Sequence, residues 1–202
     1  MCLYTKMKAP IVAKKPITCY KVLRKNMHSI IYKSFEWEFG KLYETEMQFY
    51  ESPLFGIVPE KIAQAFHSYK SYKDIREACL LYSQPFIIVE CTIPTGATFY
   101  AGCHGDEEGF ASNQIIINKV VDIKKVFSHF PWDEFPYKEG QTIRIIVNGR
   151  NEGTHKIENI LPGRGSIVDI LLDNGSIYTT DRQGKSIYDY TTEIVEQSNK
   201  ED

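Results

Sequence analysis

Few residues of the chain are spaced as metal ligands or as a nucleophile with its base. Cys103 and His104 form the one adjacent cysteine–histidine pair, and no CxxC or HxxxH pattern accompanies them, so the sequence does not predict a metal site. Cys2 could act as an N-terminal nucleophile if Met1 were removed, with its own amine as the general base. Such enzymes usually carry glycine after the cysteine, whereas Leu3 follows Cys2 here. We therefore expect neither chemistry.

Polar side chains that could line a binding site stand beside apolar strand-like runs or in loops of the first part of the chain. They are Arg24, Ser68, Ser71, Glu107, Glu108 and Gln114. Arg24 ends the run 17–23, which is rich in β-branched and aromatic residues and predicts a strand. Gln114 stands directly before the apolar run 115–117, and the two glutamates precede it in a Gly-rich loop.

The order of these features resembles the mono-ADP-ribosyltransferase fold of the arginine–serine–glutamate type. The resemblance covers about the first 125 residues and implies an α+β domain with a mixed sheet and helices. It places Arg24 at the dinucleotide-phosphate position and Ser68, or Ser71, at the serine position, although the family's Ser-Thr-Ser run is absent. The chain also resembles uncharacterised short proteins of Bacteroides-type bacteria and their phages or mobile elements, which implies no activity.

The position that the family gives to its catalytic glutamate is occupied here by Gln114. A carboxylate is needed there because glycosyl transfer from NAD passes through an oxocarbenium-like cation, which a negative charge stabilises. Glutamine keeps the hydrogen bond but loses the charge, and removing such a preorganised group typically costs about a hundredfold or more in rate. Glu107 and Glu108 could substitute only if their loop folds back.

The resemblance therefore implies a non-catalytic cleft for a nucleotide-like ligand or a protein partner, lined by Arg24, Ser68 and Gln114. Two alternatives stay open. One is an active mono-ADP-ribosyltransferase that uses NAD with Glu107 or Glu108, and the other is a purely structural or interaction module. No cofactor other than NAD, and that only under the first alternative, is expected.

The elements that would position these residues form an expected α+β domain over 1–126. Apolar runs bounded by turn residues predict strands at 85–93, 97–101, 114–117 and 120–123. Alternating aromatic and polar residues at 28–51 predict a further strand or hairpin edge. Helical spacing predicts two helices, one opening at Pro59 and one over 71–82. The apolar face of the first would consist of Ile62, Ala65 and Phe66.

An aromatic and proline-rich linker is predicted at 127–138, followed by a small all-β domain at 139–196 and a frayed tail at 197–202. Short runs separated by Gly-containing turns predict its strands at 142–147, 154–160, 166–172, 176–180 and 186–190. Their spacing favours a closed barrel of the SH3-like or OB kind, and it resembles KOW and Tudor-like barrels. Acidic residues offset its basic ones, so we expect protein contact or structural support, with nucleic acid unlikely.

Composition excludes several other classes of protein. The 202 residues are 43% hydrophobic and 25% charged, with a net charge of −2, which is typical of a globular chain. No run approaches the roughly 18 apolar residues of a membrane span, and no membrane partner is expected.

The basic start without an apolar signal core indicates a cytoplasmic protein. Residues 1–25 hold seven basic residues and no acid, which predicts an extended, solvated segment.

Overall fold

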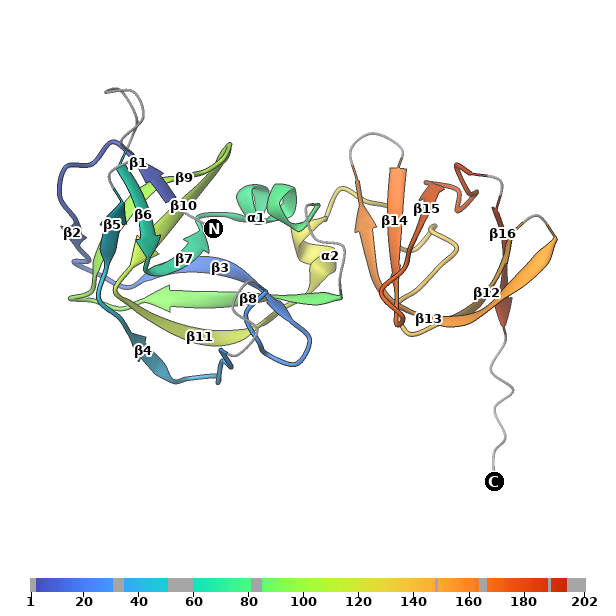
Figure 1. Ribbon diagram of the computed structural model, residues 1–202, viewed down its shortest axis with the longest axis horizontal. Coiled ribbons are helices and arrows are strands. Elements are labelled where there is room, and N and C mark those ends of the chain that lie inside the picture. Colours follow the sequence, from blue (N-terminus) through green and yellow to red (C-terminus); the bar gives the residue numbers. More distant parts are fainter. Residues whose placement is uncertain are drawn as a thin grey trace. The chain divides into compact units, whose positions relative to one another are not determined.

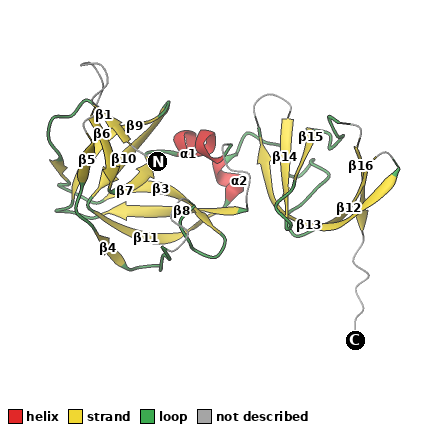
Figure 2. Ribbon diagram, in the orientation of Figure 1, coloured by secondary structure: helices red, strands yellow, loops and turns green. Residues whose placement is uncertain are grey.

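The computed structural model describes residues 3–30, 35–50, 60–80, 85–147, 149–163, 167–188 and 190–195, and these are mostly in β-strands (Figures 1 and 2). The chain forms two compact units. The first unit comprises Met1–Cys79 and Ile87–Val126, and the second unit comprises Leu80–Phe86 and Phe127–Asp202.

The first unit is built on a sheet in the order β4-β11-β8-β3-β7-β10-β9-β1-β6-β5, with β2 paired to β9. All its strand pairs with a described register are antiparallel. β3 lies between β8 and β7, so its side chains neighbour those of both. The strands are β1 (Leu3–Thr5), β2 (Ile11–Val12), β3 (Ile17–Arg24), β4 (Leu42–Glu44), β5 (Gln48–Tyr50), β6 (Glu60–Gln64), β7 (Phe66–Tyr69), β8 (Phe86–Ile93), β9 (Thr98–His104), β10 (Glu107–Ser112) and β11 (Gln114–Val121).

The helix predicted to open at Pro59 is wrong, because β6 and β7 occupy this part of the chain. Ile62 is fully buried and pairs with Leu3 of β1, while Ser68 pairs with Phe110 of β10. Pairing with β1 and β10 therefore outweighed the local helical spacing of the apolar residues. Pro59 itself lies outside the described residues.

The acidic segment predicted as a loop is a β-hairpin formed by β9 and β10. Gly105 supplies its turn with a φ of 75°, a conformation that glycine adopts without strain. Glu107 and Glu108 are the first two residues of β10 and pair with His104 and Cys103 of β9. The two strands predicted at 114–117 and 120–123 are one strand, β11, whose register shifts between Ile117 and Lys119.

Two helices are present in the described chain, α1 (Tyr72–Cys79) and α2 (Ile123–Val126). α1 confirms the helix predicted over 71–82, and it buries Ile75, Ala78 and Cys79. Neither helix has the length and apolar character needed to cross a bilayer. The protein is mostly β, and the expected α+β architecture of the transferase type is not confirmed.

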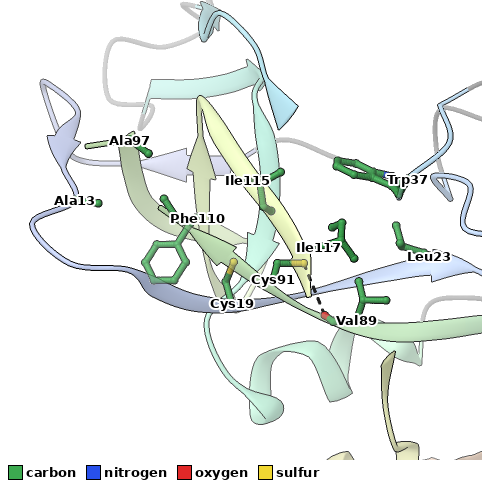
Figure 3. Close-up of a cluster of buried hydrophobic side chains, with 11 residues drawn as sticks. Ala13, Cys19, Leu23, Trp37, Val89, Cys91, Ala97, Phe110, Ile115 and Ile117 are labelled. Carbon is green, nitrogen blue, oxygen red and sulfur yellow. Dashed lines mark hydrogen bonds between the residues drawn. The ribbon is translucent and has the colours of Figure 1, made fainter. Parts of the chain in front are cut away.

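The core of the first unit covers one face of the sheet around β3, β8 and β11 (Figure 3). Its buried members are Ala13, Cys19, Leu23, Trp37, Val89, Cys91, Ile93, Ala97, Phe110, Ile115 and Ile117. The prediction that residues 1–25 form a solvated segment is wrong, since β1, β2 and β3 come from it and Leu3 and Cys19 are fully buried. The charge count misled the prediction because exposed lysines stand in the same segment as buried residues such as Leu3, Ala13 and Cys19.

The second unit holds a five-stranded antiparallel sheet in the order β15-β14-β13-β12-β16. Its strands are β12 (Thr142–Val147), β13 (Arg150–Pro162), β14 (Ile167–Leu172), β15 (Ile177–Asp181) and β16 (Tyr190–Val195). β13 pairs first with β12 and then with β14, and its register with β14 shifts between Ile157 and Asn159. The sheet curves into a half-barrel, and the described pairings leave β15 and β16 as the ends of its path.

The aromatic segment 127–138, proposed above as a linker, belongs to the second unit. Phe127, Phe130 and Phe135 are buried, and the rings of Phe130 and Phe135 meet edge to face at 5.2 Å. Tyr137 donates from its hydroxyl to the carbonyl oxygen of Gly184 at 3.2 Å. The first contact is internal to the segment, and the second joins the segment to the turn that follows β15.

Candidate functional site

The structure does not bring Arg24, Ser68 and Gln114 to one place. Arg24 is the last residue of β3, and Gln114 is the first residue of β11. These strands lie on either side of β8 and run the same way in Figure 1, so the two residues occupy opposite ends of their strands. Gln114 donates from Nε2 to Glu44 Oε1 of β4. The amide that replaces the family's glutamate thus has a partner at the sheet edge.

Arg24 and Ser68 lie on neighbouring strands but face opposite sides of the sheet. Tyr20 pairs with Tyr69, and continuing this antiparallel register places Lys21, not Arg24, opposite Ser68. Side chains alternate along a strand, so Arg24 points to the face opposite that of Lys21. Arg24 Nε is buried there, and no described residue gives it a hydrogen-bond partner.

Glu107 and Glu108, the carboxylates of the transferase alternative, lie at the turn end of the β9–β10 hairpin. The Glu108 carboxylate forms an ion pair with Lys70 Nζ, and its backbone N–H donates to Asp74 Oδ1 of α1 at 2.9 Å. The Ser71 hydroxyl donates to the other Asp74 carboxylate oxygen. Ser71 and Glu108 therefore have partners that fix α1 to the hairpin.

Lys21, Ser68 and Trp37 are the residues that the structure does bring together. Lys21 projects from β3 on the core face, where its ammonium lies 5.2 Å from the centre of the Trp37 ring. The same ammonium donates to the backbone carbonyl oxygen of His67 in β7. Within the described part of the chain, no carboxylate forms an ion pair with Lys21, so this cation sits in the core face with a ring and a carbonyl as its neighbours.

Aromatic rings surround Trp37 on the other sides. Phe35, Tyr43 and Phe66 have ring centres 4.6, 4.8 and 5.7 Å from that of Trp37, in edge-to-face arrangements. Phe35 keeps 37% of its surface exposed. The Lys41 ammonium lies 5.4 Å from the Tyr43 ring on an exposed side chain. The group therefore extends from the core to the surface.

One hydrogen-bond donor in this group is buried and unsatisfied, and a second is buried with only a sulfur as its partner. Trp37 is 5% exposed and Ser68 is 1% exposed. Trp37 Nε1 has no hydrogen-bond partner among the described residues. Apart from the sulfur of Cys19 beside it, the Ser68 hydroxyl has none either. Leaving a buried donor unpaired costs about 1–3 kcal/mol, so an acceptor from another molecule would stabilise the Trp37 indole N–H. We call Lys21, Trp37 and Ser68 the donor cluster.

Two thiols extend the donor cluster along the core face, Cys19 of β3 and Cys91 of β8. A hydrogen bond from Cys91 lowers the pKa of Cys19, and the Ser68 hydroxyl and the Lys21 ammonium lower it further. Burial raises the pKa of Cys91. Burial also lowers the pKa of Lys21, and the neighbouring thiols partly offset this. The site thus combines a lysine and a thiol that both have lowered pKa values, Lys21 and Cys19.

Two histidines occupy the opposite face of β7. The His104 ring centre lies 5.3 Å from those of His67 and Tyr69, and a side chain at Gly109 would meet the His104 ring at 2.6 Å. In the parts of the chain that the structure covers, no three His, Cys, Asp or Glu side chains form a group that could hold a metal ion. These rings therefore pack over a glycine.

Sequence reasoning named Ser68 but missed Lys21, Trp37, Cys19 and Cys91. One signal was available: Cys19, Lys21 and Leu23 alternate with the outward residues of a strand whose other inward positions are apolar. A lysine at an inward position is rarely left buried without a reason. Trp37 gave no such signal, because only tertiary packing places it over β3.

Comparisons with protein-family models, with curated proteins and with solved structures found no match to this chain.

Proposed function

We propose that this protein is a non-catalytic binding protein whose donor cluster holds the acceptor-rich, anionic part of a nucleotide-like ligand. The observation that carries the proposal is the buried Trp37 Nε1 donor without an acceptor, beside the Ser68 hydroxyl, whose one partner is the Cys19 sulfur, and the Lys21 ammonium. All three groups donate hydrogen bonds, so they favour one kind of ligand group. A phosphate or carboxylate oxygen would accept from each of them and would neutralise the half-buried Lys21 cation.

The aromatic rings support the nucleotide-like character of the ligand. Phe35, Tyr43 and Phe66 surround Trp37 and reach the surface at Phe35. A planar base stacks on such rings with about 1–3 kcal/mol per base. A ligand with a ring at one end and an anion at the other would therefore match the order of aromatic and cationic groups between the surface and β3.

We propose binding without turnover. The transferase alternative needs Glu107 or Glu108 to act on NAD, whereas the carboxylate of Glu108 is paired with Lys70 on the hairpin that anchors α1. Arg24 would take no part in the same site, since it faces the other side of β3. The relationship to ADP-ribosyltransferases is accordingly proposed as a degenerate one, limited to the order of elements.

For the second unit we propose an SH3-like barrel that contacts proteins or provides structural support. Five antiparallel strands and a long β13 shared by two hairpins support this. Closing this five-stranded sheet into a barrel would need backbone contacts between its two end strands, β15 and β16. Nuclear Overhauser effects between backbone protons of these two strands would establish it, and an open edge on both would exclude it.

Tryptophan fluorescence tests the ligand proposal, because the chain has two tryptophans, Trp37 and Trp132. In Trp132→Phe, emission reports Trp37 alone. We expect ADP-ribose and AMP to change this emission saturably, adenosine to act more weakly because it lacks the anion, and Lys21→Met to abolish the response. Lys14→Met, which removes an exposed lysine, is the matched control. No saturable change with any of the three probes would refute the proposal, as would full retention of binding in Lys21→Met.

A further inference from the structure

Two buried thiols lie side by side on neighbouring strands of the core. Cys19 on β3 and Cys91 on β8 are each 0% exposed, and Figure 3 shows their sulfur atoms next to each other in the group of buried side chains. Both cysteines are free. Cys91 Sγ lies 3.8 Å from the carbonyl oxygen of Val89. Cysteines facing each other on adjacent strands have Cβ separations within the range that a disulfide bridges.

The surroundings give the two thiols different roles. Cys19 has three groups that stabilise its thiolate: the Cys91 thiol, the Ser68 hydroxyl and the Lys21 ammonium. Cys91 remains a thiol because burial opposes its ionisation. The thiolate is the nucleophile in sulfur chemistry. Cys19 is placed to attack because it shares the core face of β3 with Lys21, two residues along the strand, and Cys91 is placed to resolve the product.

The other described cysteines lack this arrangement. Cys79 is buried in α1, where burial raises its pKa and no cation or thiol lowers it. Cys103 lies on β9 and is half-buried. Among the described residues, only Cys19 and Cys91 have a second thiol as an interaction partner.

We propose that Cys19 and Cys91 are a redox-active dithiol that a small hydroperoxide oxidises to a disulfide joining β3 to β8. The Cys19 thiolate attacks one peroxide oxygen, the O–O bond breaks, and Cys19 becomes a sulfenic acid while hydroxide leaves. Cys91 then attacks the Cys19 sulfur, its proton and the leaving hydroxyl departing as water. In total, two thiols and one hydrogen peroxide give one disulfide and two waters.

Burial selects the size of the oxidant. Neither sulfur is exposed, so a bulky disulfide such as glutathione disulfide cannot reach Cys19 in the folded protein, whereas hydrogen peroxide is close to water in size. The inference stands apart from the ligand proposal, because it rests on the two thiols and not on any acceptor at Trp37 or Ser68.

Mass spectrometry of the folded protein tests this proposal. After treatment with equimolar hydrogen peroxide, we expect the intact mass to fall by about 2 Da, as two hydrogens are lost, and to return with dithiothreitol. Peptide mapping after alkylation should find Cys19 linked to Cys91, with Cys79 and Cys103 alkylated. Cys79→Ser is the matched control and should form the same link.

A trapping experiment separates the two roles and does not depend on disulfide formation. In Cys91→Ser that is treated with peroxide while folded and then unfolded in the presence of dimedone, we expect dimedone to trap Cys19 as its sulfenic acid. In Cys19→Ser treated in the same way, Cys91 should be trapped at least about tenfold less, because Ser68 and Lys21 interact with Cys19. The proposal fails if peroxide leaves the pair reduced, if the link involves Cys103, or if a Cys19–Cys91 link forms only after denaturation.

Discussion

At the scale of single residues, Lys21 is notable because its ammonium lies on the core face and forms no ion pair with any described carboxylate. Lys21 is half-buried, and taking a cation out of water without a carboxylate partner is costly. Its contacts are a ring and one carbonyl oxygen. We expect Lys21→Met to leave the melting temperature unchanged or raise it by a few degrees, where about 1 kcal/mol corresponds to roughly 2–4 °C in a chain of this size. ADP-ribose affinity should fall at least about tenfold, or 1.4 kcal/mol.

Thermal unfolding followed by circular dichroism checks the first part of this expectation, and calorimetric titration checks the second. Lys14→Met should change neither quantity. If Lys21→Met lowered the melting temperature by many degrees, Lys21 would be a structural residue and its burial would need no ligand.

Gln114 offers a second test at this scale. Under the transferase resemblance, restoring the carboxylate would restore activity, but Gln114 Nε2 donates to Glu44 at the sheet edge. We expect Gln114→Glu to release no nicotinamide from NAD and to lose about 0.5 kcal/mol of stability, since like charges directly opposite on paired strands repel. Gln114→Glu with Glu44→Gln should regain that stability. Nicotinamide release that disappears on Glu108→Ala would instead favour an active transferase.

At the scale of elements, β3 contacts α1 through two tyrosines. The ring centres of Tyr20 and Tyr72 lie 4.8 Å apart. Burial and the Tyr72 hydroxyl raise the pKa of Tyr20 to about 12. An unfolded tyrosine ionises near pH 10, so between about pH 10 and 12 the folded chain binds more protons than the unfolded one. The contribution of Tyr20 to stability is therefore complete below pH 10 and is lost as the pH rises toward 12.

Urea unfolding at several pH values measures this effect. The loss of unfolding free energy between pH 10 and pH 12 should be smaller in Tyr20→Phe than in the wild type, and Tyr188→Phe, at an exposed tyrosine, should behave as the wild type. Equal pH dependence in all three proteins would show that the β3–α1 contact does not control the ionisation of Tyr20.

Elements with a local signal were predictable from the sequence, and elements that depend on distant partners were not. β3, β8 and β12 follow runs of β-branched and apolar residues, and α1 follows helical spacing after a capping serine. The sequence did not predict β6 because Ile62 pairs with Leu3, which is far from it in sequence. The donor cluster was not predicted for the same reason, since Lys21, Trp37 and Ser68 come from three separate segments.

At the scale of the whole molecule, the basic segment 1–25 supplies strands and buried apolar side chains to the first unit. We expect Lys6, Lys8, Lys14 and Lys15 changed together to glutamine to alter the unfolding free energy little, because all four are exposed and surface charges contribute about 0–1 kcal/mol. Leu3→Ala should cost about 2–5 kcal/mol, as expected for a leucine buried in a core. Denaturant unfolding distinguishes this account from a detached basic segment, for which Leu3→Ala would have no effect.

The most direct test of the donor cluster compares the two tryptophan indole N–H groups by ¹⁵N nuclear magnetic resonance. Trp37 Nε1 has no partner among the described residues, whereas Trp132 Nε1 donates to the carbonyl oxygen of Phe127 at 3.1 Å. The two signals are assigned with Trp37→Phe and Trp132→Phe. On titration with ADP-ribose, the Trp37 indole signal should move saturably downfield as it gains an acceptor, while the Trp132 signal stays in place. A stationary Trp37 signal at saturating ADP-ribose, or movement of Trp132 alone, would contradict the proposed site.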